Sequence, residues 1–180
     1  MDFPYLSSAV KFAILATFGE LLGRRISKKT WQVEGFGLAS KAILWFFFGM
    51  VVKAAFVLFS AGMPALISSM GFAASGLLAA FAISLGLNGV FGPVFMTFHK
   101  ITDMHIASHK GSLKALIHPL DIKKALKEID WEVQYGFIIK KTIPFFWIPA
   151  HTLVFMLPQL YQMLCAALLG VVLGVILSLR

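Results

Sequence analysis

Long apolar runs, separated by short basic or polar segments, dominate the chain. The longest extends over residues 54–98, a stretch of 45 residues without a charged side chain. About 20 apolar helical residues cross a hydrocarbon core of about 30 Å, so this run is too long for one crossing. Glycine, proline and serine at residues 61–64 and again at 68–71 predict a short uncharged hairpin between two spans.

The same pattern predicts an all-α fold, a polytopic transmembrane helical bundle in a single domain. We expect four spans, at residues 6–26, 36–59, 72–98 and 159–179. The third is rich in small residues, which let helix backbones approach closely in lipid, so it is expected at the bundle centre. Gly86 belongs to this small-residue set, and Pro93 is expected to kink the span.

The last span carries a small residue at every fourth position, which predicts a helix contact within the bundle or between subunits. These residues are Ala166, Gly170, Gly174 and Ser178.

Two further segments join the third and fourth spans. Residues 99–141 hold eight lysines against five acids, with apolar residues at helical spacing, so a short amphipathic helix is expected on the membrane surface. Residues 142–158 are uncharged but contain three prolines, and they are expected to form a kinked or re-entrant segment.

The charge distribution predicts an orientation. Residues 24–29 and 99–141 hold 12 of the 16 basic residues, and cytoplasmic loops carry such an excess of lysine and arginine. Both loops are therefore expected on the cytosolic side or its equivalent, with the 61–71 hairpin and both termini opposite. If residues 142–158 cross completely, there are five spans and the carboxyl terminus moves to the cytosolic side.

Composition supports an integral membrane protein. Hydrophobic residues make up 59% of the chain, charged residues 13%, and the mean hydropathy is +0.85, whereas soluble domains are about 25% charged. The net charge of +8 lies beside apolar spans, so it indicates contact with the lipid bilayer and anionic lipid head groups and not nucleic acid. The single cysteine, Cys165, excludes an internal disulfide and a multi-cysteine zinc site. No signal peptide is expected at the amino terminus.

Several motifs resemble those of one family, in the same order along nearly the whole chain. Residues 147–158, Trp-Ile-Pro-Ala-His-Thr-Leu-Val-Phe-Met-Leu-Pro, resemble the closing signature of the Mpv/PMP family of small peroxisomal and mitochondrial membrane proteins. Residues 88–95 are similar to its Asp-Gln...Ala-Pro segment, and Gly19-Glu20 is similar to the Gly-Asp that ends its first helix. The chain departs from the family where Leu87 replaces an acid, Lys41 a histidine and Val154 an asparagine.

This resemblance implies a four-helix, pore-like protein, for which passage of small solutes across organelle membranes has been proposed. The departures indicate a divergent, bacterial type of member. The expected location is therefore the cytoplasmic membrane of a bacterium, or otherwise the mitochondrial inner or peroxisomal membrane.

Charged residues inside the spans are the sharpest chemical signal, because an ionisable group at the bilayer centre costs at least about 2.5–3.5 kcal/mol and usually faces a partner or water. Glu20 and Lys41 are expected near the same membrane face as a supporting ion pair. Lys11 and Lys53 lie toward the other face, where Asp2 is the available acid. Both lysines either snorkel to the head groups or line a water-filled lumen that favours anions.

Two polar residues occur beside helix breaks. Asn88 is the only asparagine in the chain and lies close to Pro93, so it either bonds across helices near the broken backbone or lines a pore. His151 lies between two prolines, where it is either a buried hydrogen-bonded histidine or a solute contact.

His99, Asp103, His105 and His109 suggest a metal site, since His105 and His109 share one helical face. However, Ile106 stands where a zinc protease has glutamate, and desaturase-like enzymes use several histidine boxes. We therefore interpret these residues as a solvated interfacial cluster, and we expect no metal, no cofactor and no enzymatic activity.

The sequence thus predicts a weakly selective passive pore for small hydrophilic solutes, including anionic ones, formed by the chain alone or as a homo-oligomer. Lys11, Lys53, Asn88 and His151 are the expected lining residues. The alternative is a structural or assembly protein that packs through its small-residue helix faces without transport.

Overall fold

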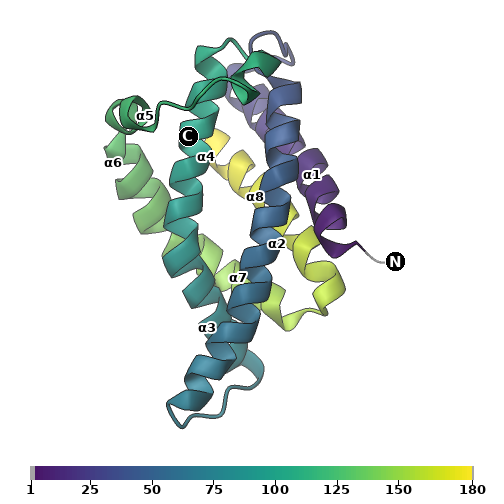
Figure 1. The fold of residues 1–180 in the computed structure, drawn as a ribbon, viewed down its shortest axis with the longest axis vertical. Coiled ribbons are helices and arrows are strands. Elements are labelled where there is room, and N and C mark those ends of the chain that lie inside the picture. The colour runs from purple at the N-terminus through teal and green to yellow at the C-terminus, as the bar shows by residue number, and fades with distance from the viewer. Residues whose placement is uncertain (1–2, 180) are drawn as a thin grey trace.

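The computed structural model describes residues 3–179, which form helices joined by short loops and contain no strand. The helices run down and up the bundle in chain order (Figure 1). Their bounds are α1 Pro4–Lys28, α2 Leu38–Ser69, α3 Gly76–Gly86, the π-helical η1 Leu87–Phe91, α4 Gly92–Ser108, the 3₁₀ turn η2 Leu113–Leu116, α5 Ile122–Glu128, α6 Trp131–Val133, the π-helical η3 Gln134–Trp147, α7 Ile148–Met156 and α8 Gln159–Ser178.

Four helices are long and apolar enough to cross a membrane, which is the number expected from the sequence. They are Pro4–Lys28, Leu38–Ser69, Gly76–Ser108 and Gln159–Ser178. The expected bounds of the first and last are close to these, but those of the second and third are too short.

The second helix continues past the predicted turn at residues 61–64. Pro64 lies inside α2, because a transmembrane helix tolerates a proline whose freed backbone groups are satisfied by its surroundings. The turn comes at Gly71, within the second predicted break at residues 68–71. Gly71 has φ +85°, a conformation that only glycine adopts without strain. The Phe72 amide then donates to the Ile67 carbonyl at 3.2 Å, as at many helix ends.

The third helix also extends further than expected, to Ser108 instead of residue 98. Within it, η1 widens the helix by one π-helical turn directly before Pro93. A proline has no amide hydrogen and its ring collides with the carbonyl four residues earlier, and a π-bulge gives that carbonyl room. The expected distortion at Pro93 is therefore present as a π-turn.

Residues 131–156 are continuously helical through α6, η3 and α7. Pro144 and Pro149 do not end this helix. Pro144 lies inside the wide η3, and Pro149 is the second residue of α7, directly after η3. Wide π-helical winding before a proline gives room to the carbonyl that the proline ring would otherwise meet. The chain leaves the helix only at Leu157 and Pro158.

α8 runs in the same direction as α1. A Cβ added to Gly19 would lie 3.0 Å from the Val171 Cα, and one added to Gly23 would lie 3.8 Å from the Ser178 Cβ. Four alternating spans would have made these helices antiparallel. The segment 131–156 accounts for the difference, because it returns the chain to the opposite end before α8 begins (Figure 1).

α1 and α2 cross at Gly49 with almost no space between their backbones. A Cβ at this position would lie 2.7 Å from the Ser8 carbonyl oxygen and 2.8 Å from the Ala9 Cα. Beside the crossing, buried apolar residues from α1, α2, α7 and α8 form the main core, including Phe12, Phe56, Val154 and Ala167.

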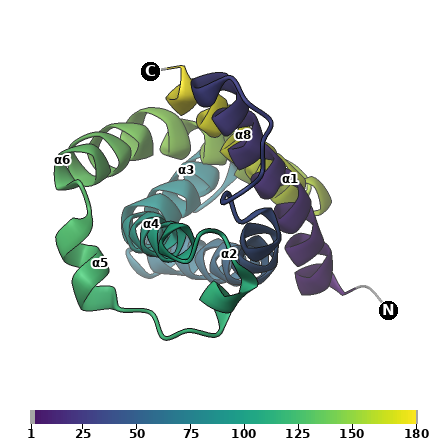
Figure 2. The same ribbon diagram turned by 90° about the horizontal axis from the view of Figure 1, so that it is seen from above.

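The polar segment between α4 and α6 contains a shorter helix than expected, α5, which lies at the periphery of the bundle (Figure 2). Ile129 ends α5 in an extended conformation and packs with Ala125 against Ile101 of α4. Asp130 then starts a new helix, because its side chain accepts the Val133 amide hydrogen. The sequence places Ile122, Leu126, Ile129 and Val133 at helical spacing, but the structure divides them between two helices, so they do not form one continuous stripe.

Candidate functional site

A cluster of polar side chains lies between α1, α2 and α4. Its members are Glu20 from α1, Lys41 and Trp45 from α2, and His99 and Asp103 from α4, and we call them the carboxylate cluster. The last four are two pairs spaced by four residues, so each pair lies on one face of its helix.

The two carboxylates hold one ammonium group. Lys41 Nζ donates to Glu20 Oε2 at 2.5 Å and also to Asp103 Oδ1. The Lys41 side chain is only 9% exposed, while those of Glu20 and Asp103 are 19% and 29% exposed. The structure therefore contains the Glu20–Lys41 pair that the sequence predicted, with Asp103 as a second acid.

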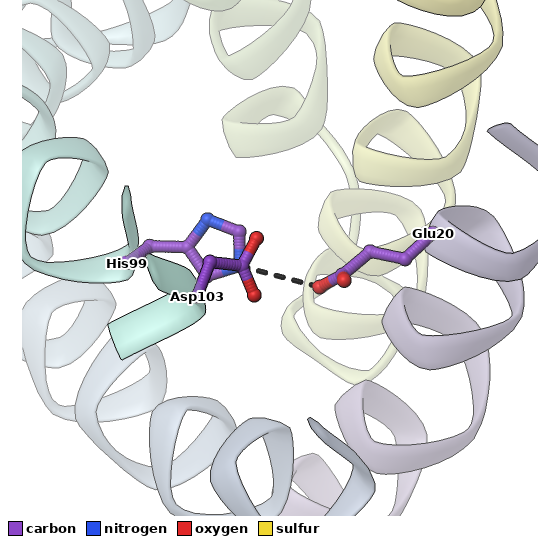
Figure 3. Close-up of side chains that lie close together, drawn as sticks. All are labelled: Glu20, His99 and Asp103. Atoms are coloured by element: carbon purple, nitrogen blue, oxygen red, sulfur yellow. Dashed lines mark hydrogen bonds and ion pairs between the residues drawn. The ribbon is translucent and has the colours of Figure 1, made fainter. Parts of the chain in front are cut away.

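The other oxygen of Glu20 also faces donors. Trp45 Nε1 donates to Glu20 Oε1 at 2.5 Å, and His99 Nε2 lies 3.2 Å from the same oxygen. The His99 ring packs against Trp45 with a centroid distance of 4.7 Å, which directs it toward Glu20 across the gap between α4 and α1 (Figure 3).

Three groups of the cluster have the chemistry of metal ligands. Glu20, His99 and Asp103 each offer one potential ligand atom, and these three atoms lie within 4.8 Å of one another. Two carboxylates and an imidazole suit a borderline divalent cation. In the structure, the cation between the two carboxylates is the Lys41 ammonium.

A second buried polar group joins α3, η1 and α7, and we call it the amide cluster: Ser84, Asn88, His151 and Thr152. Asn88 Oδ1 lies 3.0 Å from His151 Nδ1, so the histidine donates there. Asn88 Nδ2 donates to the Ser84 carbonyl at 2.8 Å, and both Ser84 and Thr152 donate their hydroxyls to the Ile148 carbonyl. Each of the four residues is buried, with at most 7% of its surface exposed.

Asn88 therefore bonds across helices, which was one of its two predicted roles, although its partner is His151 and not the backbone at Pro93. His151 is the buried hydrogen-bonded histidine that was one of its alternatives. The indole N–H of Trp147, beside His151, is buried and has no hydrogen-bond partner among the described residues. The Trp147 ring lies 5.1 Å from His151.

Aromatic rings separate the two clusters along the third helix. Phe95 stacks on Phe91 at 5.2 Å and meets the edge of Phe48 at 5.1 Å and that of Trp45 at 6.3 Å. Since Trp45 also touches the carboxylate cluster, polar, aromatic and polar layers follow one another inside the bundle.

Within the described part of the chain, neither of the other two expected lining residues makes a hydrogen bond or ion pair with either cluster. Lys11 borders a shallow hollow of ≈ 420 Å³ beside the start of α1. Lys53 is 7% exposed in α2, and among residues 3–179 no acid is within ion-pair distance of it. Asp2, the acid expected near these lysines, lies outside the described residues.

The predicted packing residues differ in their surroundings. A Cβ on Gly86 would lie 2.7 Å from the Met63 sulfur, and one on Gly174 would lie 3.6 Å from the Gly19 carbonyl oxygen. Ala166 is buried in the main core. A Cβ on Gly170, in contrast, would meet nothing within 4 Å.

The histidine-rich segment divides between two environments. His99 and Asp103 face Glu20 and Lys41 inside the bundle, so the interpretation as one solvated cluster was wrong for them. The helix was expected to end at residue 98, and the four-residue spacing of His99 and Asp103 was the signal for an inward face. His105 instead bonds the Ala115 carbonyl, beside the stacked rings of His109 and His118.

Trp45 and Ser84 were not identified from the sequence. Trp45 belongs to an aromatic run that also suits a lipid-facing surface, and Ser84 belongs to a run of small residues. Only the folded arrangement shows that their side chains bond Glu20 and the Ile148 carbonyl.

Comparisons of the chain with known protein families, with curated proteins and with solved structures give no match.

Proposed function

We propose that the chain is a multi-pass membrane protein that passes small hydrophilic solutes through the interior of its bundle, in a gated manner. The observation that carries this proposal is the layered interior, with the carboxylate and amide clusters on either side of the Phe91–Phe95 stack. Ionisable and polar groups inside membrane segments usually face a pathway or one another. Here they do the latter, and the aromatic layer closes the route between them.

The closed route needs two movements to open. The aromatic side chains around Phe95 have to change rotamer, and the ammonium of Lys41 has to leave at least one carboxylate. The π-turn η1 carries both Asn88 of the amide cluster and Phe91 of the aromatic stack, and π-bulges in helices are frequent at functional sites.

For the membrane orientation, we propose five crossings. The segment 131–156 is helical over 26 residues, which is enough for a tilted crossing. The ends of α1, α4 and α8 then meet at one face together with the basic loops, and the positive-inside rule puts that face in the cytosol. Exposed Ile117, Ile122 and Trp131, among the lysines of residues 110–141, suit the interface with anionic head groups.

Solute release from liposomes tests the transport proposal. Vesicles carrying the purified protein are expected to release small anionic and uncharged dyes faster than empty vesicles. Asn88→Leu combined with His151→Leu is expected to reduce that release, while Lys11→Met, away from both clusters, is expected to preserve it. Tight vesicles in all solutes and at all protein densities would contradict the proposal.

The alternative function is structural, and the bonding of the amide cluster favours it, because its side chains satisfy one another. In this case Lys53→Leu leaves function intact, while Gly170→Leu disrupts association. Since a Cβ on Gly170 meets nothing in the monomer, a loss of association would report a contact between chains. Crosslinking in nanodiscs distinguishes the two outcomes.

Membership of the Mpv/PMP family is also part of the proposal, and the order of the motifs supports it. Residues 147–158 contribute His151 to the amide cluster, and residues 88–95 contribute Asn88. The two motifs are thus in direct contact across helices. To test whether the two share an activity, this protein and a member of that family are reconstituted in separate liposomes, and the release of the same set of solutes is compared.

A further inference from the structure

We propose that Glu20, His99 and Asp103 form a binding site for a borderline divalent metal ion, such as Zn²⁺, for which the Lys41 ammonium is the built-in competitor. This inference does not depend on the proposed transport function, because metal binding can be measured on the purified protein.

The geometry of the donors supports the site. The three donor atoms lie within 4.8 Å of one another and come from two helices, α1 and α4. Zinc and similar ions bind carboxylate oxygens and imidazole nitrogens at about 2.0–2.2 Å, so the three ligand side chains need only small movements to close on an ion, once the Lys41 ammonium has left its place between the carboxylates. Three protein ligands leave a coordination position for water or a solute.

Neighbouring residues hold the donors in position. Trp45 Nε1 donates to Glu20 Oε1 at 2.5 Å, and the indole and Phe48 rings pack against the His99 ring at 4.7 and 6.0 Å. Bonds and packing of this kind orient metal ligands and raise their affinity. They also connect the site directly to the aromatic layer.

A cationic group already lies between the two carboxylates. The Lys41 ammonium donates to both carboxylates, and a metal ion would have to displace it. The same ammonium lies 5.2 Å from the centroid of the Phe36 ring, whose face attracts cations and offers the displaced side chain a second contact.

The site is also reachable. The side chains of Glu20, His99 and Asp103 are 19–29% exposed, and they lie toward the end of the bundle where α1 and α4 finish. Part of each ligand side chain therefore lies at the surface of the bundle, so an ion can reach the site without unfolding it.

Titration with Zn²⁺ and with Co²⁺, whose absorption spectrum reports its ligands, tests the proposal. His105→Ala, His109→Ala and His118→Ala serve as the common background, because they remove other imidazoles. Lys41→Met is expected to bind one ion per chain at least ten times more tightly than the background protein. Adding Glu20→Gln to Lys41→Met is expected to remove that gain.

A second measurement covers the case in which Lys41→Met folds poorly. In the Lys41-containing background, Glu20→Gln and Asp103→Asn are expected to weaken Zn²⁺ binding at least tenfold, while Glu34→Gln on the loop after α1 leaves it unchanged. Equal affinity in Lys41→Met and Lys41→Met/Glu20→Gln would overturn the proposal. Equal Zn²⁺ affinity in the Lys41-containing background and in its Glu20→Gln and Asp103→Asn variants would also overturn the proposal.

Discussion

At the scale of single residues, Lys41 is the centre of the structure's charge balance. Its ammonium is shared by two carboxylates from different helices, and it is the most buried member of the ion-paired group. Removing one acid leaves a pair, whereas removing the lysine leaves two carboxylates facing each other inside the bundle. Breaking a buried ion pair by deleting one partner costs about 3–5 kcal/mol.

We therefore expect Lys41→Met to lower the free energy of unfolding by about 3 kcal/mol and Glu20→Gln to lower it by clearly less. Thermal or denaturant unfolding in a defined detergent measures both. Lys11→Met is the control, because Lys11 lies in a shallow hollow beside the start of α1. A larger loss with Glu20→Gln than with Lys41→Met would show that the lysine is not the residue that balances the cluster.

The sequence predicted part of this cluster because a charge inside a span needs a partner. Glu20 and Lys41 were paired on that ground and because both were expected near the same membrane face. Asp103 and His99 could not be added, since their inward direction depends on α4 continuing past residue 98. The pairing of Asn88 with His151 could not be predicted either, because the pattern of apolar and polar residues along the chain does not show that α7 packs against α3.

At the scale of helices, glycines decide where backbones meet. Gly49 brings α1 and α2 into direct backbone contact, and Gly19 and Gly174 do the same for α1 and α8. Without a hydrophobic force between helices in lipid, such close packing supplies much of the association. Every side chain larger than hydrogen at Gly49 has to push α1 away.

Gly49→Val is accordingly expected to destabilise the protein by about 1–3 kcal/mol through overpacking and to weaken the contacts of the carboxylate cluster. Gly62→Val in the same helix is the matched control, because a Cβ there meets nothing within 4 Å. The unfolding midpoints of the two variants in detergent provide the comparison. Equal midpoints would contradict the close crossing of α1 and α2.

Prolines were the least reliable signals at this scale. Pro64 predicted a turn, and Pro144 and Pro149 predicted a disrupted segment, yet all three lie in helices. In two places the helix accommodates a proline by π-helical winding, around Pro93 and around Pro144. The actual turn lies at Gly71, which has a positive φ, and the sequence predicted a break there, at residues 68–71, as well as the incorrect one at 61–64.

At the scale of the whole molecule, the direction of α8 decides the arrangement. Hydropathy alone predicted four spans, and four helices meet that description. The parallel packing of α8 on α1 requires a further pass through the bundle, and the segment 131–156 provides it. Its lysines and prolines reduce its hydropathy, which is why the sequence left the two topologies open.

Labelling from one side of the membrane tests this arrangement. In a Cys165→Ser background, Ser178→Cys and Lys110→Cys are expected to react with an impermeant thiol reagent from the same side, and Gly71→Cys from the other. Labelling of Ser178→Cys from the side of Gly71→Cys would support four crossings and contradict the orientation of α8.

The central claim is that the polar interior serves passage and that water reaches the amide cluster when the route opens. The most direct measurement is the reactivity of Asn88→Cys toward a small water-soluble thiol reagent, in liposomes and in the Cys165→Ser background. The control is Ala167→Cys, at a position 1% exposed in the apolar core. Asn88→Cys is expected to react steadily while Ala167→Cys stays protected, and equal protection of both would show a dry interior and contradict passage.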